Sequence, residues 1–178
     1  MQSGSVRKEH YQYEKNGSCS LLLAIEPKTG KRIAEVYERR TMQEYTLFMK
    51  KVADAFPEAV KIRLVQDNLN THNTGSFYAC LDAEEAFALS ERFEFFYTPK
   101  SASWLNMAEI EFSALAKQCL HRRIPTLEKL RTEVLALVKE RAEKQLKIDW
   151  QFSIQGARTK LNKSYSKVNS GNLKFENT

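Results

Sequence analysis

Two short polar stretches of this sequence carry the side chains with the clearest potential for chemistry. The first is Gln-Asp-Asn-Leu-Asn-Thr-His at 66–72, which contains Asp67, and the second is residues 98–109, which ends in Glu109. Two carboxylates at one edge of a sheet can hold a divalent metal ion beside a phosphodiester, because ions such as magnesium prefer oxygen ligands. This chemistry usually requires a third carboxylate, and the sequence upstream of Asp67 offers no obvious candidate.

Asp67 directly follows a predicted buried strand at 61–66. In open α/β sheets, ligands bind at the carboxyl ends of strands, which favours a functional role for this carboxylate. The alternative is that Asp67 and Asn68 form an Asx turn that ends the strand. His72 lies five residues further on. In a functional role it polarises a phosphate or positions water near a metal; the alternative is that it makes only local hydrogen bonds.

Glu109 lies in the first turn of a predicted helix, at the N3 position after Asn106. In the simplest interpretation, it completes a capping box with Asn106 and has no further role. In the functional interpretation, its side chain projects from the helix start towards Asp67. Glu111 lies about 200° further round the helix and cannot share that role. We therefore choose Glu109 as the candidate metal ligand of this helix.

Several basic residues are candidates for contacts with phosphate groups. Lys100 follows a predicted strand at 93–97 and either meets a phosphate or is an ordinary solvated lysine. Further basic residues gather between positions 121 and 163, although acidic residues are interleaved with part of them, as on a helix face with ion pairs. From this group we choose Arg122, Arg123, Arg158 and Lys160.

The composition bounds the class of protein. The chain has 178 residues, of which 42% are hydrophobic, so it fits one domain with a substantial core. Its formal net charge of +6 mildly favours a polyanionic partner. Three widely spaced cysteines without a CxxC pair predict free thiols in a reducing cytosol. Without an apolar run of about 18 residues or a signal peptide, we expect a cytoplasmic protein that does not contact membranes.

Common catalytic signatures of other enzyme classes are absent. The sequence contains no glycine-rich phosphate loop, no G-x-S-x-G motif and no H-E-x-x-H motif. These absences argue against nucleotide hydrolysis, serine esterase chemistry and zinc peptidase chemistry, because each of those reactions depends on its motif.

The elements that must position the carboxylates follow an α/β order. Apolar runs at 20–25 and 31–38, separated by a turn, predict a β-hairpin. Thr41 and Glu44 form a capping box that opens a helix ending at Pro57. The remaining signals predict a strand at 61–66, a helix at 82–92, a strand at 93–97, a helix at 106–120 and a long helix after Pro125. This order indicates a mixed sheet flanked by helices.

Taken together, the motifs resemble the catalytic region of insertion-sequence transposases of the six-thirty group, which are relatives of the Tc/mariner transposases. The resemblance rests on residues 67–72, 97–100, 103–109 and 118–124, and it extends over about residues 6–165. It implies a ribonuclease-H-like fold and a DDE or DDD carboxylate triad that uses Mg²⁺, with Mn²⁺ as a substitute. By this resemblance, Asp67 is the second acidic residue of the triad and Glu109 is the third. From their types and positions we add Asn68, His72, Lys100 and Asn106 as candidates for active-site support, and we keep Arg122, Arg123, Arg158 and Lys160 as candidate DNA contacts.

The resemblance also predicts an incomplete domain. In that family the first aspartate lies on the first strand of the sheet, before the segment that resembles residues 1–16 here, and this sequence has no counterpart of it. The family's N-terminal helix-turn-helix region is missing as well. We therefore expect a partial catalytic domain over residues 1–165, a sheet that lacks its first strand, and a polar tail over residues 166–178.

Three functional hypotheses follow from these observations. The first is metal-dependent DNA cleavage and strand transfer by a transposase domain that is incomplete as given. The second is a non-catalytic remnant that binds DNA or pairs with another protein, and the third is a ribonuclease-H-like nuclease of another kind. The expected partners are transposon-end and target DNA, together with a second copy of the chain or an upstream transposase half. The expected location is the bacterial cytoplasm or nucleoid.

Overall fold

The computed structural model describes residues 17–67, 69–98, 105–151, 153–156 and 158–159. The predicted order of strands and helices is confirmed, with one short helix added. In chain order, the elements of the described residues are β1 (Ser20–Ile25), β2 (Arg32–Tyr37), α1 (Met42–Asp54), β3 (Ile62–Gln66), α2 (Gly75–Cys80), α3 (Ala83–Glu91), β4 (Phe93–Tyr97), α4 (Ala108–Gln118) and α5 (Leu127–Glu143). None of these helices has the length and apolar character that would let it cross a membrane.

The four described strands form two pairs. β1 and β2 pair antiparallel with Ser20 opposite Tyr37, and β3 and β4 pair parallel with Ile62 opposite Phe93. The antiparallel and parallel pairings expected of a mixed sheet are therefore both present. Among the described residues, however, the pairs form two separate two-stranded sheets, because β1 and β3 do not hydrogen-bond to each other.

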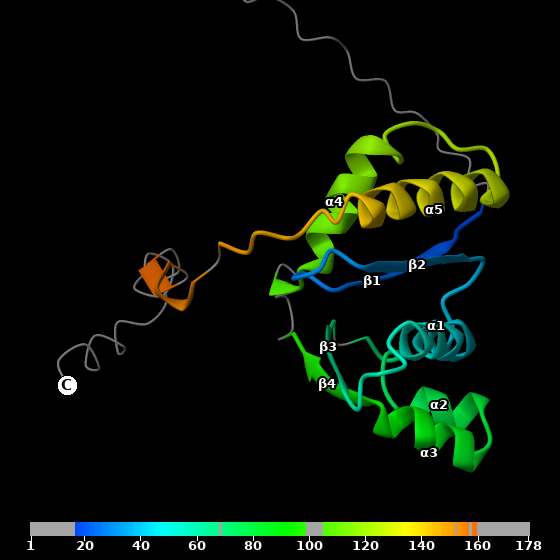
Figure 1. Ribbon diagram of the computed structural model, residues 1–178. Coiled ribbons are helices and arrows are strands. Elements are labelled where there is room, and N and C mark those ends of the chain that lie inside the picture. The colour runs from blue at the N-terminus through cyan, green and yellow to red at the C-terminus, as the bar shows by residue number, and fades with distance from the viewer. Residues whose placement is uncertain (1–16, 68, 99–104, 152, 157, 160–178) are drawn as a thin grey trace, which may run out of the picture.

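Helices cover both faces of the β1–β2 hairpin. Figure 1 shows α4 and α5 on one side of the hairpin and α1 on the other side, with α2 and α3 beyond α1. The side chains of β1 alternate between two hydrophobic clusters, as expected for a strand. Leu22 and Ala24 pack against the cluster formed by α1, α2, α3 and β4 with Ile33 of β2, whereas Leu21 and Leu23 pack against the cluster formed by β2, α4 and α5. β1 is therefore an apolar strand with a core on each face.

Polar side chains cap the N-termini of α1 and α5. The predicted capping box of α1 is confirmed: Thr41 accepts a hydrogen bond from the backbone of the first turn, and Glu44 accepts one from the Thr41 backbone at 2.9 Å. α5 begins after Thr126, whose hydroxyl accepts a hydrogen bond from the Lys129 N–H at 3.2 Å. Each cap satisfies N–H groups that the helix itself leaves unpaired, which fixes where the helix starts.

Candidate active site

Four of the residues selected from the sequence line a single cavity of about 400 Å³: Asp67, His72, Asn106 and Glu109. The cavity lies between β1 and the carboxyl-terminal part of β3, with residues of α1 and of the start of α4 closing its faces. Asp67 and Glu109 are 42 positions apart in the sequence, yet the fold brings them to one space. The fold therefore brings both carboxylates to the lining of one cavity.

His72 contacts the carboxylate of Asp67. Asp67 is half-buried directly after β3, and its Oδ1 lies 3.1 Å from Nδ1 of His72. His72 is buried and stacks on Tyr45, with ring centroids 4.7 Å apart and planes inclined by 15°. This stacking fixes the plane of the imidazole, so the histidine can orient the carboxylate of Asp67. Among the described residues, Nε2 of His72 has no hydrogen-bond partner.

The loop that carries His72 is braced through Gln66. Tyr45 donates a hydrogen bond from its hydroxyl to Oε1 of Gln66 at 3.0 Å, and Nε2 of Gln66 donates to the backbone oxygen of His72 at 2.8 Å. Burial raises the pKa of Tyr45, so its hydroxyl stays protonated and remains a donor. A chain of hydrogen bonds thus connects α1, the last residue of β3 and the loop beside Asp67.

The predicted capping box between Asn106 and Glu109 is wrong. α4 begins at Ala108, so Glu109 is its second residue rather than the third after a cap. The Asn106 side-chain oxygen accepts a hydrogen bond from the Ala108 N–H at 3.1 Å, and the Glu109 N–H is bonded instead to the Asn106 backbone oxygen at 3.1 Å. Glu109 is exposed, and its carboxylate makes no hydrogen bond to any described residue. It is therefore free to bind a ligand in the cavity.

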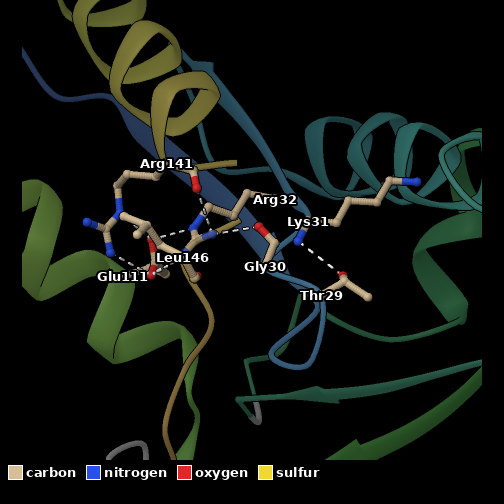
Figure 2. Close-up of polar contacts among 7 residues, drawn as sticks. All are labelled: Thr29, Gly30, Lys31, Arg32, Glu111, Arg141 and Leu146. Atoms are coloured by element: carbon tan, nitrogen blue, oxygen red, sulfur yellow. Dashed lines mark hydrogen bonds and ion pairs between the residues drawn. The ribbon is translucent and has the colours of Figure 1, made fainter. Parts of the chain in front are cut away.

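A buried ion-pair cluster, which the sequence analysis missed, holds α4 in place. Figure 2 shows Glu111 of α4 between Arg32 of β2 and Arg141 of α5. Arg32 donates to both carboxylate oxygens of Glu111 at 2.8 and 2.7 Å, and Arg141 donates to both at 3.0 Å. The remaining donors of Arg32 reach the backbone oxygens of Gly30 and Leu146, each at 2.6 Å. α4 is therefore fastened to two neighbouring elements two residues after Glu109.

The charges of this cluster decide the protonation state of Glu111. Burial alone would raise the pKa of its carboxyl group, but the hydrogen bonds and charges of Arg32 and Arg141 outweigh burial and lower the pKa from 4.5 to about 2. Glu111 is thus ionised at neutral pH and fully engaged by two arginines. It supports the position of Glu109 and is not itself available to a ligand.

Two arginines at the cavity were not selected from the sequence. Arg40 is exposed between β2 and α1, and Arg63 lies on β3, where it pairs with Glu94 at 2.9 Å. Arg40 makes no hydrogen bond or ion pair to a described residue, so its guanidinium is available for a phosphate oxygen. The sequence feature that could have identified Arg40 is its position directly before Thr41, the predicted cap of the helix.

The basic residues chosen from the sequence are not gathered at the cavity. Arg122 pairs with Glu133 at 2.6 Å, and Arg123 is exposed on the same connection between α4 and α5. Figure 1 shows this connection at the far end of α4 from Ala108, and it shows residues 153–156 and 158–159, which include the exposed Arg158, well apart from both. Asn68, Lys100 and Lys160 lie outside the described residues.

The fold and the cavity together define an α/β protein in which two carboxylates line one cavity at the carboxyl end of a strand. This arrangement is typical of enzymes that transfer phosphoryl groups with metal ions. A family model described as DDE superfamily endonuclease matches residues 1–131, more than half of the chain, which therefore belongs to that superfamily. Its α/β fold is of the ribonuclease-H-like class. We found no match to a curated protein or to a solved structure.

Proposed function

We propose that this chain is the part of an insertion-sequence transposase of the Tc/mariner-like type that carries Asp67 and Glu109. Such a transposase cleaves and joins DNA strands with Mg²⁺ or Mn²⁺. The observation that carries the proposal is the single cavity lined by both carboxylates in a chain of the DDE superfamily. When bound, the metal ions would supply an activated water or DNA 3′-hydroxyl and stabilise the leaving oxygen. DNA ends and target DNA are the corresponding substrates.

The donors at the cavity suit a hard divalent cation. Asp67 and Glu109 provide carboxylate oxygens, and Asn106 lines the same space with its amide. Oxygen ligands of this kind are those that Mg²⁺ and Mn²⁺ take in proteins. His72 would act through its contact with Asp67, holding the carboxylate in one orientation, and Arg40 would contact a phosphate of the DNA backbone.

A two-carboxylate site is an incomplete version of the DDE triad. Within the described part of the chain, no group of three or more His, Cys, Asp or Glu side chains is arranged to hold a metal. We propose that the third carboxylate comes from a segment that would lie beside Asp67. Without it, one ion binds weakly and cleavage falls by orders of magnitude, because residues of one catalytic unit do not act independently.

The metal site can be tested with the chain as it stands. In nuclear magnetic resonance spectra of the labelled chain, small additions of Mn²⁺ should broaden the amide signals around Asp67 and Glu109 most strongly. The double variant Asp67→Asn/Glu109→Gln should lose this broadening. Its control is Asp54→Asn/Glu58→Gln, which removes the same charge from two exposed residues outside the cavity lining. Broadening that survives the first variant, or that disappears in the control, would show that Mn²⁺ follows net charge and not this site.

The same variants separate catalysis from simple DNA binding. If the domain is catalytic, nicking of supercoiled DNA in Mn²⁺ should appear when a segment carrying the third carboxylate is supplied, and it should then require both Asp67 and Glu109. A non-catalytic DNA-binding remnant would instead show salt-sensitive DNA binding that persists without either carboxylate. Absence of nicking even with that segment supplied, together with persistent DNA binding in the chain and in its variants, would favour that second role.

A further inference from the structure

Tyr45 of α1 reaches the loop beside Asp67 through two different parts of its side chain. Its ring stacks on the imidazole of His72, with centroids 4.7 Å apart and planes inclined by 15°. Its hydroxyl donates to Oε1 of Gln66 at 3.0 Å, and Nε2 of Gln66 donates to the backbone oxygen of His72 at 2.8 Å. Both paths end on the same residue, so one tyrosine holds the ring and the backbone of His72.

Tyr45 is itself held in place by its surroundings. It is 3% exposed, and its ring also stacks on that of Phe77 in α2, with centroids 6.0 Å apart and planes inclined by 11°. Gln66, which takes its hydrogen bond, is buried at the end of β3. Side chains that packing locks in one rotamer can fix the geometry of a site, because they leave their contact partners little freedom. Tyr45 therefore has the rigidity that a positioning residue requires.

His72 passes this constraint on to Asp67. A carboxylate oxygen only accepts hydrogen bonds, so the contact of 3.1 Å between Oδ1 of Asp67 and Nδ1 of His72 places an imidazole proton on Nδ1. No other hydrogen bond joins the carboxylate to a described residue. Oδ1 of Asp67 is therefore occupied, and Oδ2 is the oxygen left for a ligand.

We propose that Tyr45 is a positioning residue for Asp67, which acts through His72 to hold the carboxylate in one rotamer with Oδ2 open to a ligand. As far as that ligand is a metal ion, the inference rests on the proposed function. Tyr45 itself would touch neither the metal nor the DNA. A carboxylate that offers a single oxygen suits Mg²⁺, because this ion demands near-ideal octahedral geometry.

Two substitutions separate the ring of Tyr45 from its hydroxyl. Tyr45→Phe keeps the stacked ring and removes the donor to Gln66, whereas Tyr45→Leu removes both. In nuclear magnetic resonance spectra without metal, the ring protons of His72 should keep their shifts in Tyr45→Phe and move in Tyr45→Leu, where the facing aromatic ring is lost. The Hα–Hβ couplings of Asp67 should report one rotamer in the unaltered chain and an average over several rotamers in Tyr45→Leu.

Mn²⁺ binding measures the consequence for the site. The dissociation constant, taken from the broadening of signals around Asp67 and Glu109, should rise about threefold in Tyr45→Phe, as for the loss of one hydrogen bond. It should rise about tenfold or more in Tyr45→Leu, the effect of removing a residue that orients a metal ligand. Hydrogen exchange in residues 69–74 should be faster in both variants, because the loop loses its brace.

Leu89→Ala is the control that separates positioning from loss of stability. Leu89 of α3 is buried in the same hydrophobic cluster as Tyr45, but it does not line the cavity. Its truncation should lower the midpoint of urea denaturation, as expected for a core leucine. The shifts of His72 and the couplings of Asp67 should stay as they are, and the Mn²⁺ dissociation constant should change by less than about twofold.

Either of two results would overturn the inference. The first is a Mn²⁺ affinity that is unchanged in Tyr45→Phe and that Tyr45→Leu weakens no more than Leu89→Ala does, which would make Tyr45 an ordinary core residue. The second is an Asp67 side chain that already samples several rotamers in the unaltered chain, since nothing would then position it. If Tyr45→Leu does not fold, the affinity and the loop exchange of Tyr45→Phe decide alone.

The measurements without metal separate this inference from the proposed function. If Mn²⁺ does not bind around Asp67 and Glu109, the proposed metal site is wrong, and the couplings of Asp67 still decide whether Tyr45 positions its carboxylate. If Mn²⁺ binding requires both carboxylates but is the same in the Tyr45 variants, the metal site stands and the positioning role fails.

Discussion

The substitution Glu111→Ala should lower the free energy of unfolding by about 3–5 kcal/mol, a large part of the stability of an ordinary domain. The side chain of Glu111 is 1% exposed and is bonded by two arginines, of which Arg32 is completely buried. Alanine removes the only carboxylate of this cluster and leaves two like charges facing each other in the core. The loss should appear as a lower midpoint in urea denaturation with an unchanged slope.

The matched control lies two residues away on the same helix. Glu109→Ala removes an exposed carboxylate that makes no hydrogen bond to a described residue, so it should change stability by less than about 1 kcal/mol, mostly through the helix dipole. If Glu109→Ala proved as destabilising as Glu111→Ala, the difference in burial would not explain the result. In that case the assignment of Glu111 as the anchor of α4 would fail.

Acid titration gives the same interaction a second readout. Because the folded-state pKa of Glu111 is lowered from 4.5 to about 2, its contribution to stability is fully present above about pH 4.5 and is lost as the pH falls towards 2. The corresponding free energy is about 3 kcal/mol. The stability difference between the chain and Glu111→Gln should therefore be constant near neutral pH and shrink below pH 4.5. A difference that stayed constant down to pH 2 would contradict the lowered pKa.

Local signals in the sequence predicted most of the elements. The hairpin, α1 with its capping box, β4 and the start of α5 each depend on a turn, a cap or an apolar period within a few residues of the chain. The predicted strand and helix bounds differ from the structure by only a few residues at these places. Such features are predictable because neighbouring residues alone decide them.

α2 could not be predicted in the same way. It has six residues, begins at Gly75 and has no side-chain cap, so it has little helical preference of its own. Its stability comes from Phe77, whose partners lie on α1 and β4, and no local pattern reveals those partners. The misplaced cap at Asn106 has a related origin, because α4 begins after Met107, which makes no side-chain cap and therefore gives no local signal of the helix start.

The candidate site also combines residues that local sequence motifs identify with contacts that only the fold reveals. Asp67 and Glu109 were selected because their motifs are recognisable in sequence, and the cavity that both residues line depends on the whole fold. The Glu111 cluster joins residues 79 and 30 positions apart, so spacing along one helix could exclude Glu111 from the site but could not reveal its partners.

The substitution Phe77→Ala should lower the free energy of unfolding by about 3–5 kcal/mol, as expected for a large aromatic side chain removed from a core. Phe77 is 0% exposed, and its ring lies 6.0 Å from that of Tyr45, 6.5 Å from that of Phe93 and 6.4 Å from that of Phe95, measured between centroids. The surrounding strand and helix cannot collapse fully into the space that the ring leaves. Urea denaturation of the purified variant measures the loss.

The neighbouring helix supplies the control for Phe77→Ala and links it to the site. Phe87 of α3 is 60% exposed, so Phe87→Ala should change stability by less than about 1 kcal/mol. α2 also holds the loop beside Asp67, because the Ser76 hydroxyl donates to the Thr71 oxygen at 2.7 Å. Phe77→Ala should therefore speed hydrogen exchange in residues 69–74 more than Phe87→Ala does. Equal exchange in the two variants would show that the loop is held by Gln66 and Tyr45 alone, without support from α2.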